Sequence, residues 1–291
     1  MAHTIINQYD DLTGGAWLRG NLHTHSTASD GNFSPQELVE AYAGLGYGFL
    51  AITDHDVHTS AEDHQSVDDK GLILLAGVEA SANGTHMLCL NGDRAIEPSP
   101  DRQAVIHAAL ASGGFVITAH PNRESHFDHA TIDQLRLWDG YDGIEIFNGQ
   151  GSTNPGSPYS TAKWDLLLTE GRRVWGYAND DAHGPDTIGR GWNIAYVKER
   201  SASGLIDALA SGRFYASTGV TITDILVDGQ RIVLQTADAD RIVAVTDSGG
   251  RLAVADHPTI EIDVPDYVNY VRFECWGRGE QFAWTQPFFV S

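Results

Sequence analysis

Short apolar runs alternate with helix-like segments through the first 219 residues of the chain. Strands that alternate with helices favour parallel βα units, and seven or eight such repeats favour a sheet that closes into a barrel. We therefore expect an α/β fold, a distorted TIM-like (β/α)7 barrel, over this part of the chain. The apolar runs expected to be strands span residues 17–22, 49–53, 72–78, 86–90, 115–119, 143–147, 173–177 and 194–197.

Four of the intervening segments carry the start and stop signals of α-helices. In the first, Ser34 suits the N-cap, Pro35 suits the first helical position, and Glu37 completes a capping box. Gly44 or Gly46 can end this helix. Similar signals predict helices within residues 101–113, 161–171 and 203–212.

The sequence pattern changes after Gly219. Apolar and polar residues then alternate with a period near two, with short polar or glycine-containing turns between the runs TITDILVD, RIVLQT, RIVAVTD, TIEIDV, YVRFECWG and FAWTQPFFV. We expect residues 1–219 to form the barrel and residues 220–291 to form a small antiparallel β domain packed on it.

The chain is strongly acidic, with 18 Lys and Arg residues against 39 Asp and Glu residues and a net charge of −21. Such a surface repels polyanions, so we expect neither a nucleic-acid polymer nor a membrane as a partner. A small anionic substrate stays compatible with the charge, because bound metal ions reverse the sign locally. The sequence predicts no particular oligomeric state.

Two further expectations follow from the distribution of apolar residues. No stretch approaches the roughly 20 apolar residues of a membrane span, and the first 15 residues lack the basic and apolar segments of a secretory signal. A cytoplasmic protein is therefore expected. Cys89 and Cys275 lie in apolar stretches, which favours buried, reduced thiols over a disulfide.

Metal-capable side chains follow the apolar runs. His23 and His25 come directly after the first run, and residues two apart in an extended segment point to the same face. Both imidazoles can therefore reach one metal ion. This pair alone is weak support for a metal site, and its weight depends on the rest of the chain.

The same arrangement recurs at four more apolar runs. They are followed by Asp54 and His55, by Glu79 and then His86, by His120, and by Asp180, Asp181 and His183. Barrels of βα units build their sites at such strand ends, and imidazoles mixed with carboxylates suit zinc, iron or manganese. A capping, turn or surface role explains any one of these residues, but it explains the whole set poorly.

Five of these segments, in order, resemble the motifs of the PHP superfamily, the polymerase and histidinol phosphatase group. They read GNLHTHSTASDG, AITDHD, GVEAS, ITAHPNR and NDDAH, and the resemblance covers roughly residues 17–219. The segment GRFYASTG and the terminal AWTQPFFV also resemble a branch that includes carbaryl-hydrolase-like metallohydrolases.

The resemblance implies a centre of two or three divalent metal ions, which would be zinc, iron or manganese. The first metal would be held by the positions matching His23, His25, Glu79 and Asp181. The Glu79 carboxylate would bridge to a second metal that is held also by His86 and His120. A third metal would use Asp30, His55 and His183, although some relatives have histidine where this chain has Asp30.

Two other carboxylates neighbour the implied ligands. The pattern Asp-x-His at Asp181 and His183 matches the family, which leaves Asp180 as a turn residue or as support for a ligand. Asp54 is interpreted as an acceptor that orients a ligating imidazole.

The function implied is hydrolysis by a metal-bridging hydroxide, with Glu79, Asp181 and His183 as catalytic residues. Metal-bound water loses its proton near neutral pH, and the cationic centre favours an anionic substrate. We therefore expect a phosphoesterase acting on small phosphate monoesters or nucleotide-like substrates. The alternatives are a carboxylester, carbamate or amide hydrolase of the carbaryl-hydrolase-like branch and, from another class, a non-catalytic metal-binding domain.

Three residues are candidates for contact with the substrate. Arg123 follows His120 by three residues and is expected to pair with phosphate, although a surface or helix-end salt bridge is the competing interpretation. Asn148 and Arg190 are similar candidates. His126 and His129 are more typical of solvated loop histidines than of lid residues or proton donors.

Overall fold

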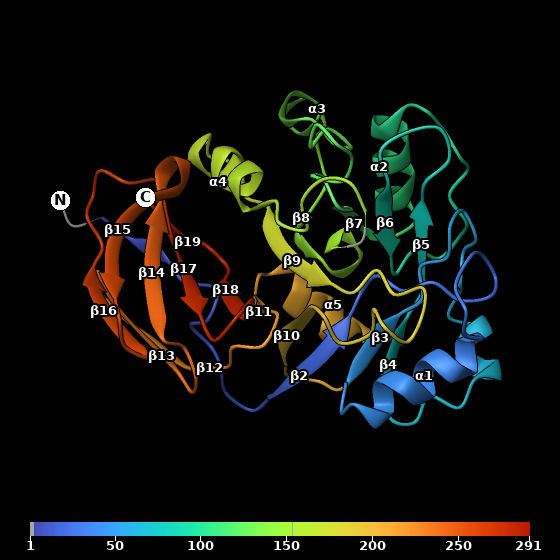
Figure 1. The fold of residues 1–291 in the computed structure, drawn as a ribbon, viewed down its shortest axis with the longest axis horizontal. Helices are drawn as coiled ribbons and strands as arrows, with labels where there is room; N and C mark the ends of the chain where they lie inside the picture. Colours follow the sequence, from blue (N-terminus) through green and yellow to red (C-terminus); the bar gives the residue numbers. More distant parts are fainter. Residues whose placement is uncertain (1–2, 153) are drawn as a thin grey trace.

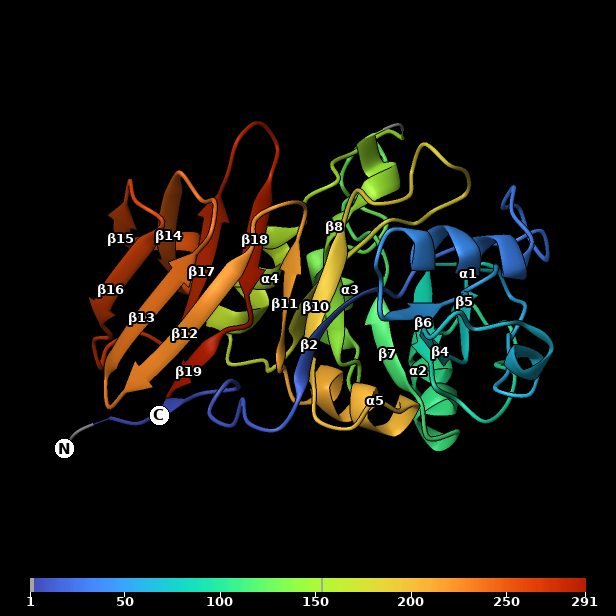
Figure 2. The ribbon, with the colours of Figure 1, turned by 90° about the horizontal axis from the view of Figure 1, so that it is seen from below.

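The computed structural model describes residues 3–152 and 154–291, and it joins a mixed α/β part to a C-terminal region of strands (Figure 1). Seen from below, the C-terminal strands lie at one end of the molecule and α1 and α2 at the other (Figure 2). The described residues form the α-helices α1 (Pro35–Gly44), α2 (Arg102–Ala111), α3 (Ile132–Leu137), α4 (Thr161–Thr169) and α5 (Ala202–Ala210).

The four predicted helices are confirmed, and the first begins as its sequence indicates. Ser34 caps α1 by accepting a hydrogen bond from the backbone N–H of Glu37, and the Glu37 carboxylate accepts from the backbone N–H of Ser34 at 2.8 Å. The short helix α3 was not predicted. Its own capping box, formed by Thr131 and Gln134, is visible in the sequence as Thr-x-x-Gln.

One five-stranded sheet holds half of the α/β part. Its order is β5–β6–β7–β8–β9, with β7, β8 and β9 parallel and with β6 antiparallel to both of its neighbours. The strands are β5 (Gly77–Ala80), β6 (Met87–Leu90), β7 (Phe115–Thr118), β8 (Gly143–Asn148) and β9 (Trp175–Asn179).

A second sheet forms the other half and continues into the C-terminal region. Within it, β2, β3 and β4 are parallel, whereas β10 is antiparallel to both β2 and β11. These strands are β2 (Ala16–Asn21), β3 (Phe49–Ala51), β4 (Ile73–Leu75), β10 (Trp192–Val197) and β11 (Phe214–Ser217). A buried core that includes Leu22, Phe49, Leu88 and Tyr177 contains side chains of both sheets.

The expectation of uniformly parallel βα units is therefore wrong, and the mixed α/β class is confirmed. The connection between β5 and β6 spans only residues 81–86, which is too short for the crossover that parallel neighbours need. Among the described residues the two sheets do not form one continuous closed sheet. Isolated parallel bridges join them at Thr24 with Ala182 and at His55 with Glu79.

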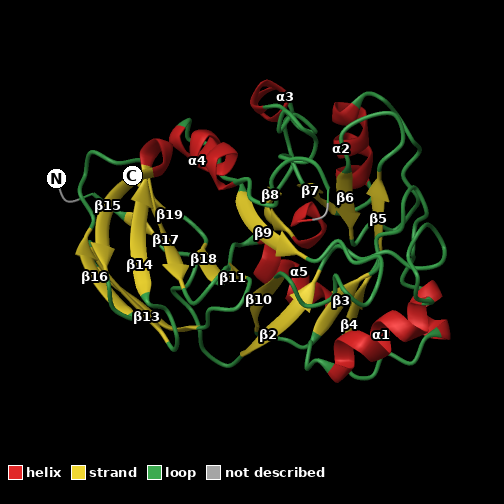
Figure 3. Cartoon of the chain, in the orientation of Figure 1, coloured by secondary structure: helices red, strands yellow, loops and turns green. Residues whose placement is uncertain are grey.

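Strands dominate the chain after residue 219 (Figure 3). β12, β13 and β16 form a three-stranded antiparallel sheet, while the other strands extend the second sheet through β18 and β11. The strands are β12 (Ile222–Asp228), β13 (Arg231–Thr236), β14 (Arg241–Thr246), β15 (Gly250–Ala255), β16 (Thr259–Asp263), β17 (Tyr270–Trp276), β18 (Phe282–Thr285) and β19 (Phe288–Val290). The N-terminal strand β1 (Ile5–Ile6) pairs with β19.

A buried ion pair ties this region to α4. Arg272 of β17 donates to both carboxylate oxygens of Asp165, at 2.7 and 2.8 Å, and Tyr270 donates its hydroxyl to the same carboxylate. All three residues are buried. The free thiols of Cys89 and Cys275 are also buried, as predicted. Among the described residues, no helix is long and apolar enough to cross a membrane.

Candidate metal centre

The metal-capable side chains meet where strands of both sheets end. His23 and His25 follow β2, His55 follows β3, His120 follows β7, and Asp181 and His183 follow β9. Glu79 lies within β5, and His86 immediately precedes the antiparallel strand β6. The two isolated bridges lie at the same strand ends, so both sheets contribute ligand candidates to one place.

A first group surrounds Asp181. The Nε2 atoms of His23 and His25 lie 3.3 and 3.2 Å from Asp181 Oδ1. The same two nitrogens lie 3.3 and 3.4 Å from the oxygens of Glu79. All four residues are buried, and they are the set expected for the first metal.

A second group shares one oxygen of Glu79. His86 Nδ1 lies 2.9 Å and His120 Nε2 lies 3.1 Å from Glu79 Oε1. Since His23 Nε2 faces this same oxygen, the Glu79 carboxylate stands between the first and second groups. That position is the one a bridging ligand would occupy.

A third group lies toward the solvent. Asp30, His25, His55 and His183 offer atoms that lie within 4.8 Å of one another. Asp30 Oδ2 is 3.3 Å from His183 Nε2 and 3.7 Å from His55 Nε2. The Asp30 side chain is 54% exposed, so this group is far more open than the other two.

Several buried atoms at the centre lack a hydrogen-bond partner among the described residues. They include His23 Nε2, both ring nitrogens of His25, His55 Nδ1 and Glu79 Oε2. Buried polar atoms are nearly always hydrogen-bonded, and these converge on one another instead. Imidazole nitrogens and carboxylate oxygens are the donors that zinc, iron and manganese bind, so the residues fit a centre of several metal ions.

Two of the candidate ligands have an unfavourable backbone conformation. His120 has φ of +28° and Asp181 has φ of +52°, a region that residues other than glycine rarely adopt. Such strain persists only where surrounding contacts impose it, and it concentrates at functional sites. The sequence gives no signal for it.

Electrostatics at the centre couples His23 to the carboxylates. Burial lowers the pKa of His23, but the charges of Asp181, Glu145 and Glu79 outweigh burial and leave this pKa well above its usual value. Burial raises the pKa of Glu79, and His23, His120 and His55 more than reverse that effect. The carboxylates are therefore held in their charged form.

Glu145 on β8 was not singled out from the sequence. Its buried carboxylate lies 2.8 Å from His23 Nδ1 and accepts hydrogen bonds from Asn179, from Asn148 and from the backbone N–H of His120. It thereby orients His23 so that Nε2 faces Glu79 and Asp181. A charged residue between two isoleucines of an apolar strand was the available signal.

His129 also lies closer to the centre than its sequence indicates. His129 Nε2 accepts from the backbone N–H of His86 at 2.9 Å, and its ring centroid is 4.6 Å from those of both His86 and His120. Burial, with smaller contributions from His120, His86 and Arg123, lowers the pKa of His129 to about 2. The interpretation of His129 as a solvated loop histidine is wrong, whereas His126 is exposed as expected.

The two neighbouring carboxylates support loops. Asp180 is buried and accepts from the Tyr42 hydroxyl and from three backbone N–H groups of residues 189–191, so it holds that loop and, among the described residues, makes no hydrogen bond to a candidate ligand. Asp54 accepts from the backbone and hydroxyl of Ser26 and from the Ser29 hydroxyl. It holds the loop after His25, so the prediction that it orients an imidazole is wrong.

The three candidate substrate contacts differ in their surroundings. Arg123 is half-buried and close enough to His129 to affect its pKa, and its side chain makes no hydrogen bond or ion pair with the described residues. Asn148 donates to Glu145 and lies 3.2 Å from Asp181 Oδ2, so its amide braces the centre. Arg190 donates to the carbonyls of Asp186 and Gly149.

Residues 21–136 match the family model of the PHP domain. This segment of the chain is similar to PHP domains. The match includes the candidate ligands from His23 to His120, whereas Asp181 and His183 lie beyond it. The PHP domain match does not test the resemblance to the carbaryl-hydrolase-like branch, because the segments that carry that resemblance lie outside residues 21–136.

A crystal structure extends the likeness to the rest of the fold. It is a two-domain protein from Bacteroides vulgatus, described as containing a predicted PHP-like metal-dependent phosphoesterase, and it aligns with a TM-score of 0.57 over 99% of this chain and 90% of that one. At 18% identity, the likeness shows the fold alone, and it includes the C-terminal strands as well as the residues that match the PHP domain model.

Two curated relatives match parts of the chain. A 5'-3' exoribonuclease from Salmonella typhimurium is 39% identical over 127 residues, which cover 41% of this chain and 43% of the relative. A 3',5'-nucleoside bisphosphate phosphatase from Chromobacterium violaceum is 36% identical over 74 residues, or 25% of this chain and 26% of the relative. The chain spans less than half the length of either relative.

Proposed function

We propose that this protein is a metal-dependent phosphoesterase acting on small phosphate monoesters or nucleotide-like substrates. The observation behind the proposal is that nine metal-capable side chains, five of them buried, gather in adjoining groups at one place. The PHP domain match and the names of the two relatives support the same reaction class.

The proposed ligands follow the three groups of side chains. His23, His25, Glu79 and Asp181 would hold the first metal, Glu79 with His86 and His120 the second, and Asp30, His55 and His183 the third. Zinc, iron and manganese suit this donor set. Bound divalent metals would lower the pKa of water and stabilise the charge that develops on a phosphoryl group.

The chain's own residues fix protons and orientation at the centre. Glu145 accepts from His23 Nδ1–H, so Nε2, which faces Glu79 and Asp181, is the ring atom that would bind a metal ion in place of its proton. His183 Nδ1 lies 3.0 Å from the backbone carbonyl of Asp181, so its proton is held there and Nε2 faces Asp30. Glu79, Asp181 and His183 are the proposed catalytic residues.

Arg123 is the proposed phosphate contact. It is half-buried beside His129, and its guanidinium has no hydrogen-bonding or ion-pair partner among the described residues. Guanidinium and phosphate form strong charge-assisted hydrogen bonds. Contacts of Arg190 and Asn148 with the substrate stay predictions. The hydrogen bonds of Asn148 to Glu145 and Asp181 favour a role in positioning these carboxylates.

A parallel assay tests the proposal. Metal-depleted protein, reloaded with Mn²⁺, Zn²⁺ or Fe²⁺, is given nitrophenyl phosphate, nucleoside monophosphates and a naphthyl carbamate. Phosphate release should fall by about 100-fold or more in His23→Ala. The matched control His107→Ala removes an exposed imidazole on α2 and should keep the activity.

The carbamate arm addresses the second candidate, a carboxylester, carbamate or amide hydrolase. This candidate rests on the resemblance of GRFYASTG and AWTQPFFV to the carbaryl-hydrolase-like branch. A metal centre that activates water can also attack a carbonyl carbon. Naphthol release without phosphate release, lost in His23→Ala, would replace the phosphoesterase proposal with this one.

A 5'-phosphorylated oligonucleotide in the same assay separates small substrates from polymers. One relative is named an exoribonuclease, whereas the net charge of −21 repels polyanions. We expect hydrolysis of mononucleotides to exceed that of the oligonucleotide. Faster degradation of the oligonucleotide would overturn the small-molecule assignment.

The proposal includes a division of the chain. Residues 1–219 would be the metal-binding unit, a distorted barrel whose two sheets meet at the Thr24–Ala182 and His55–Glu79 bridges. Residues 220–291 would be a β domain packed on it. The Arg272–Asp165 ion pair supports the packing, and the pairing of β1 with β19 adds the N-terminus to the same β region.

A further inference from the structure

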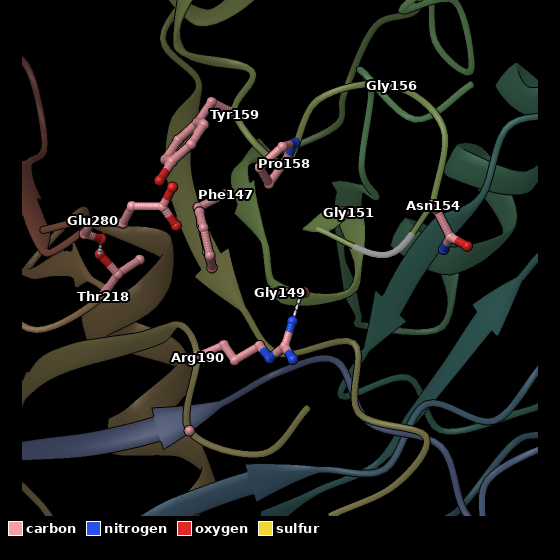
Figure 4. Close-up of a pocket in the computed structure, with 11 residues that line it drawn as sticks. Phe147, Gly149, Gly151, Asn154, Gly156, Pro158, Tyr159, Arg190, Thr218 and Glu280 are labelled. Carbon is pink, nitrogen blue, oxygen red and sulfur yellow. Dashed lines mark hydrogen bonds between the residues drawn. The ribbon is translucent and has the colours of Figure 1, made fainter. Parts of the chain in front are cut away.

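A cavity of about 690 Å³ lies beside the metal centre, between the barrel unit and the C-terminal strands. Its lining includes Phe147 and Tyr159 on one side, Arg190 and Thr218 on another, and Glu280 from the turn between β17 and β18 (Figure 4). A cavity of this size holds a nucleoside-sized molecule. None of the proposed metal ligands lines it.

The cavity begins one residue from the metal centre. Gly149 and Gly151 line it, and the backbone N–H of Gly151 donates to the side chain of Asn148. The amide nitrogen of Asn148 is 3.2 Å from Asp181 Oδ2. Asn148 therefore links the cavity wall to the candidate metal centre.

Aromatic rings form one wall of the cavity. Tyr159 packs against Phe147 with ring centroids 5.4 Å apart and against Phe282 at 5.7 Å. Trp284 lies behind both, at 6.4 Å from Phe147 and 6.3 Å from Tyr159. These neighbours hold Tyr159 in place, which suits stacking on a flat ring.

Glu280 adds a hydrogen-bond acceptor at the same end. Its backbone carbonyl accepts from the Thr218 hydroxyl, and its carboxylate makes no hydrogen bond or ion pair with the described residues. Figure 4 shows the Tyr159 hydroxyl directed toward this carboxylate. Burial, followed by the charges of Glu280 and Glu274, raises the pKa of Tyr159. The hydroxyl therefore keeps its proton as a hydrogen-bond donor.

We infer that this cavity binds the leaving group of the substrate, and that it selects a flat heteroaromatic group with an N–H donor, such as an amino-bearing nucleobase. Tyr159 would stack on the ring, and Glu280 would accept from the N–H group. The C-terminal strands would thereby set the specificity of a reaction that takes place on the barrel. This inference rests on the proposed phosphoesterase function for its choice of substrate.

Binding to metal-depleted protein tests the cavity without requiring catalysis. Adenosine should bind more tightly than purine riboside, which lacks the amino group, as measured by isothermal titration. Tyr159→Ala should weaken adenosine binding by about 10-fold or more. Glu280→Ala, which removes the acceptor, should abolish the preference for adenosine, whereas Glu97→Ala, at an exposed carboxylate outside the cavity, should not.

Kinetics provide the second readout. With metal restored, both cavity variants should lower kcat/KM for adenosine monophosphate but leave that for ribose 5-phosphate, which has no base, within about twofold. Tyr159→Leu, which keeps an apolar side chain, separates loss of stacking from loss of folding if its thermal midpoint matches the wild type.

The outcomes separate the two proposals. Equal binding of both nucleosides, undiminished adenosine binding in Tyr159→Ala, or an unchanged preference in the Glu280 variant would overturn the inference. Selective adenosine binding without any phosphate release would sustain the cavity assignment and overturn the phosphoesterase function.

Discussion

Glu79 contacts histidines of all three groups of metal-capable side chains. Its two carboxylate oxygens face His23, His86 and His120 on one side and His25 and His55 on the other. Burial of such a carboxylate is tolerated only with compensating positive charge. Imidazolium ions or bound metal ions supply that charge, and the unpaired ring nitrogens favour metal ions.

Glu145→Gln tests the positioning of His23. Glu145 offers two acceptor oxygens to four donors, whereas a glutamine offers one acceptor oxygen and a donor NH2 group, so His23 should be held less firmly. We expect metal affinity to fall by about 10- to 100-fold with the fold retained, since the residues around a ligand tune it to this extent. The measurement is a competition titration with a metal chelator. Unchanged affinity in Glu145→Gln would show that Glu145 does not position His23.

The residues that sequence reasoning identified and those that it missed differ in one respect. His23, His25 and Asp181 stand in short motifs at strand ends, where local spacing already indicates a ligand. Glu145 and His129 contact the centre across 122 and 43 residues of sequence. Such contacts depend on strand order and loop path, which one sequence does not specify.

The loop over residues 121–130 is the element that brings Arg123 and His129 to the centre. Lys163 of α4 donates to the backbone carbonyls of Pro121, Phe127 and Ala130, at 2.8, 2.6 and 2.6 Å. Burial lowers the pKa of Lys163 to about 8, so it stays mostly charged at neutral pH. One ammonium group thus holds both ends of the loop.

Lys163→Met should release this loop. Three charge-assisted hydrogen bonds are lost and their carbonyls are exposed to water, so we expect unfolding free energy to fall by about 2 kcal/mol. Cleavage of the loop by a protease should become faster than in Lys70→Met, a control that removes an exposed lysine. Equal cleavage rates in both variants would contradict the role of Lys163.

Element type was predicted better than element pairing. The helices were predicted because caps and periodicity are local, as the capping box of Ser34 illustrates. The run at residues 72–78 is instead divided between β4 and β5, which belong to different sheets. The chain passes from one sheet to the other at Ala76, between β4 and β5, and the apolar pattern alone does not indicate this change of sheet.

At the scale of the whole molecule, the buried Arg272–Asp165 pair joins the C-terminal strands to α4. Arg272→Met should lower the unfolding free energy by about 3–5 kcal/mol, because Asp165 would stay buried without its partner. Urea unfolding measures this. The control Arg241→Met breaks an exposed pair with Asp256, which solvent screens, and should change the unfolding free energy far less. Similar losses in both variants would contradict a special role for the buried pair.

The C-terminal region shows what the sequence could not reveal about the whole molecule. Alternation predicted its strands, but neither the pairing of β18 with β11 nor that of β19 with β1 follows from local pattern. These pairings place the turn with Glu280 beside the mixed α/β part, where it lines the cavity next to the candidate metal centre.

Metal titration of depleted protein tests the central claim most directly. Mn²⁺ is added stepwise while phosphate release from adenosine monophosphate and bound metal are measured together. We predict that at least two ions bind per chain, that activity appears only as the second site fills, and that His23→Ala shows neither change. Folded protein that binds its metals fully yet releases no phosphate, or that releases phosphate without metal, would contradict this account.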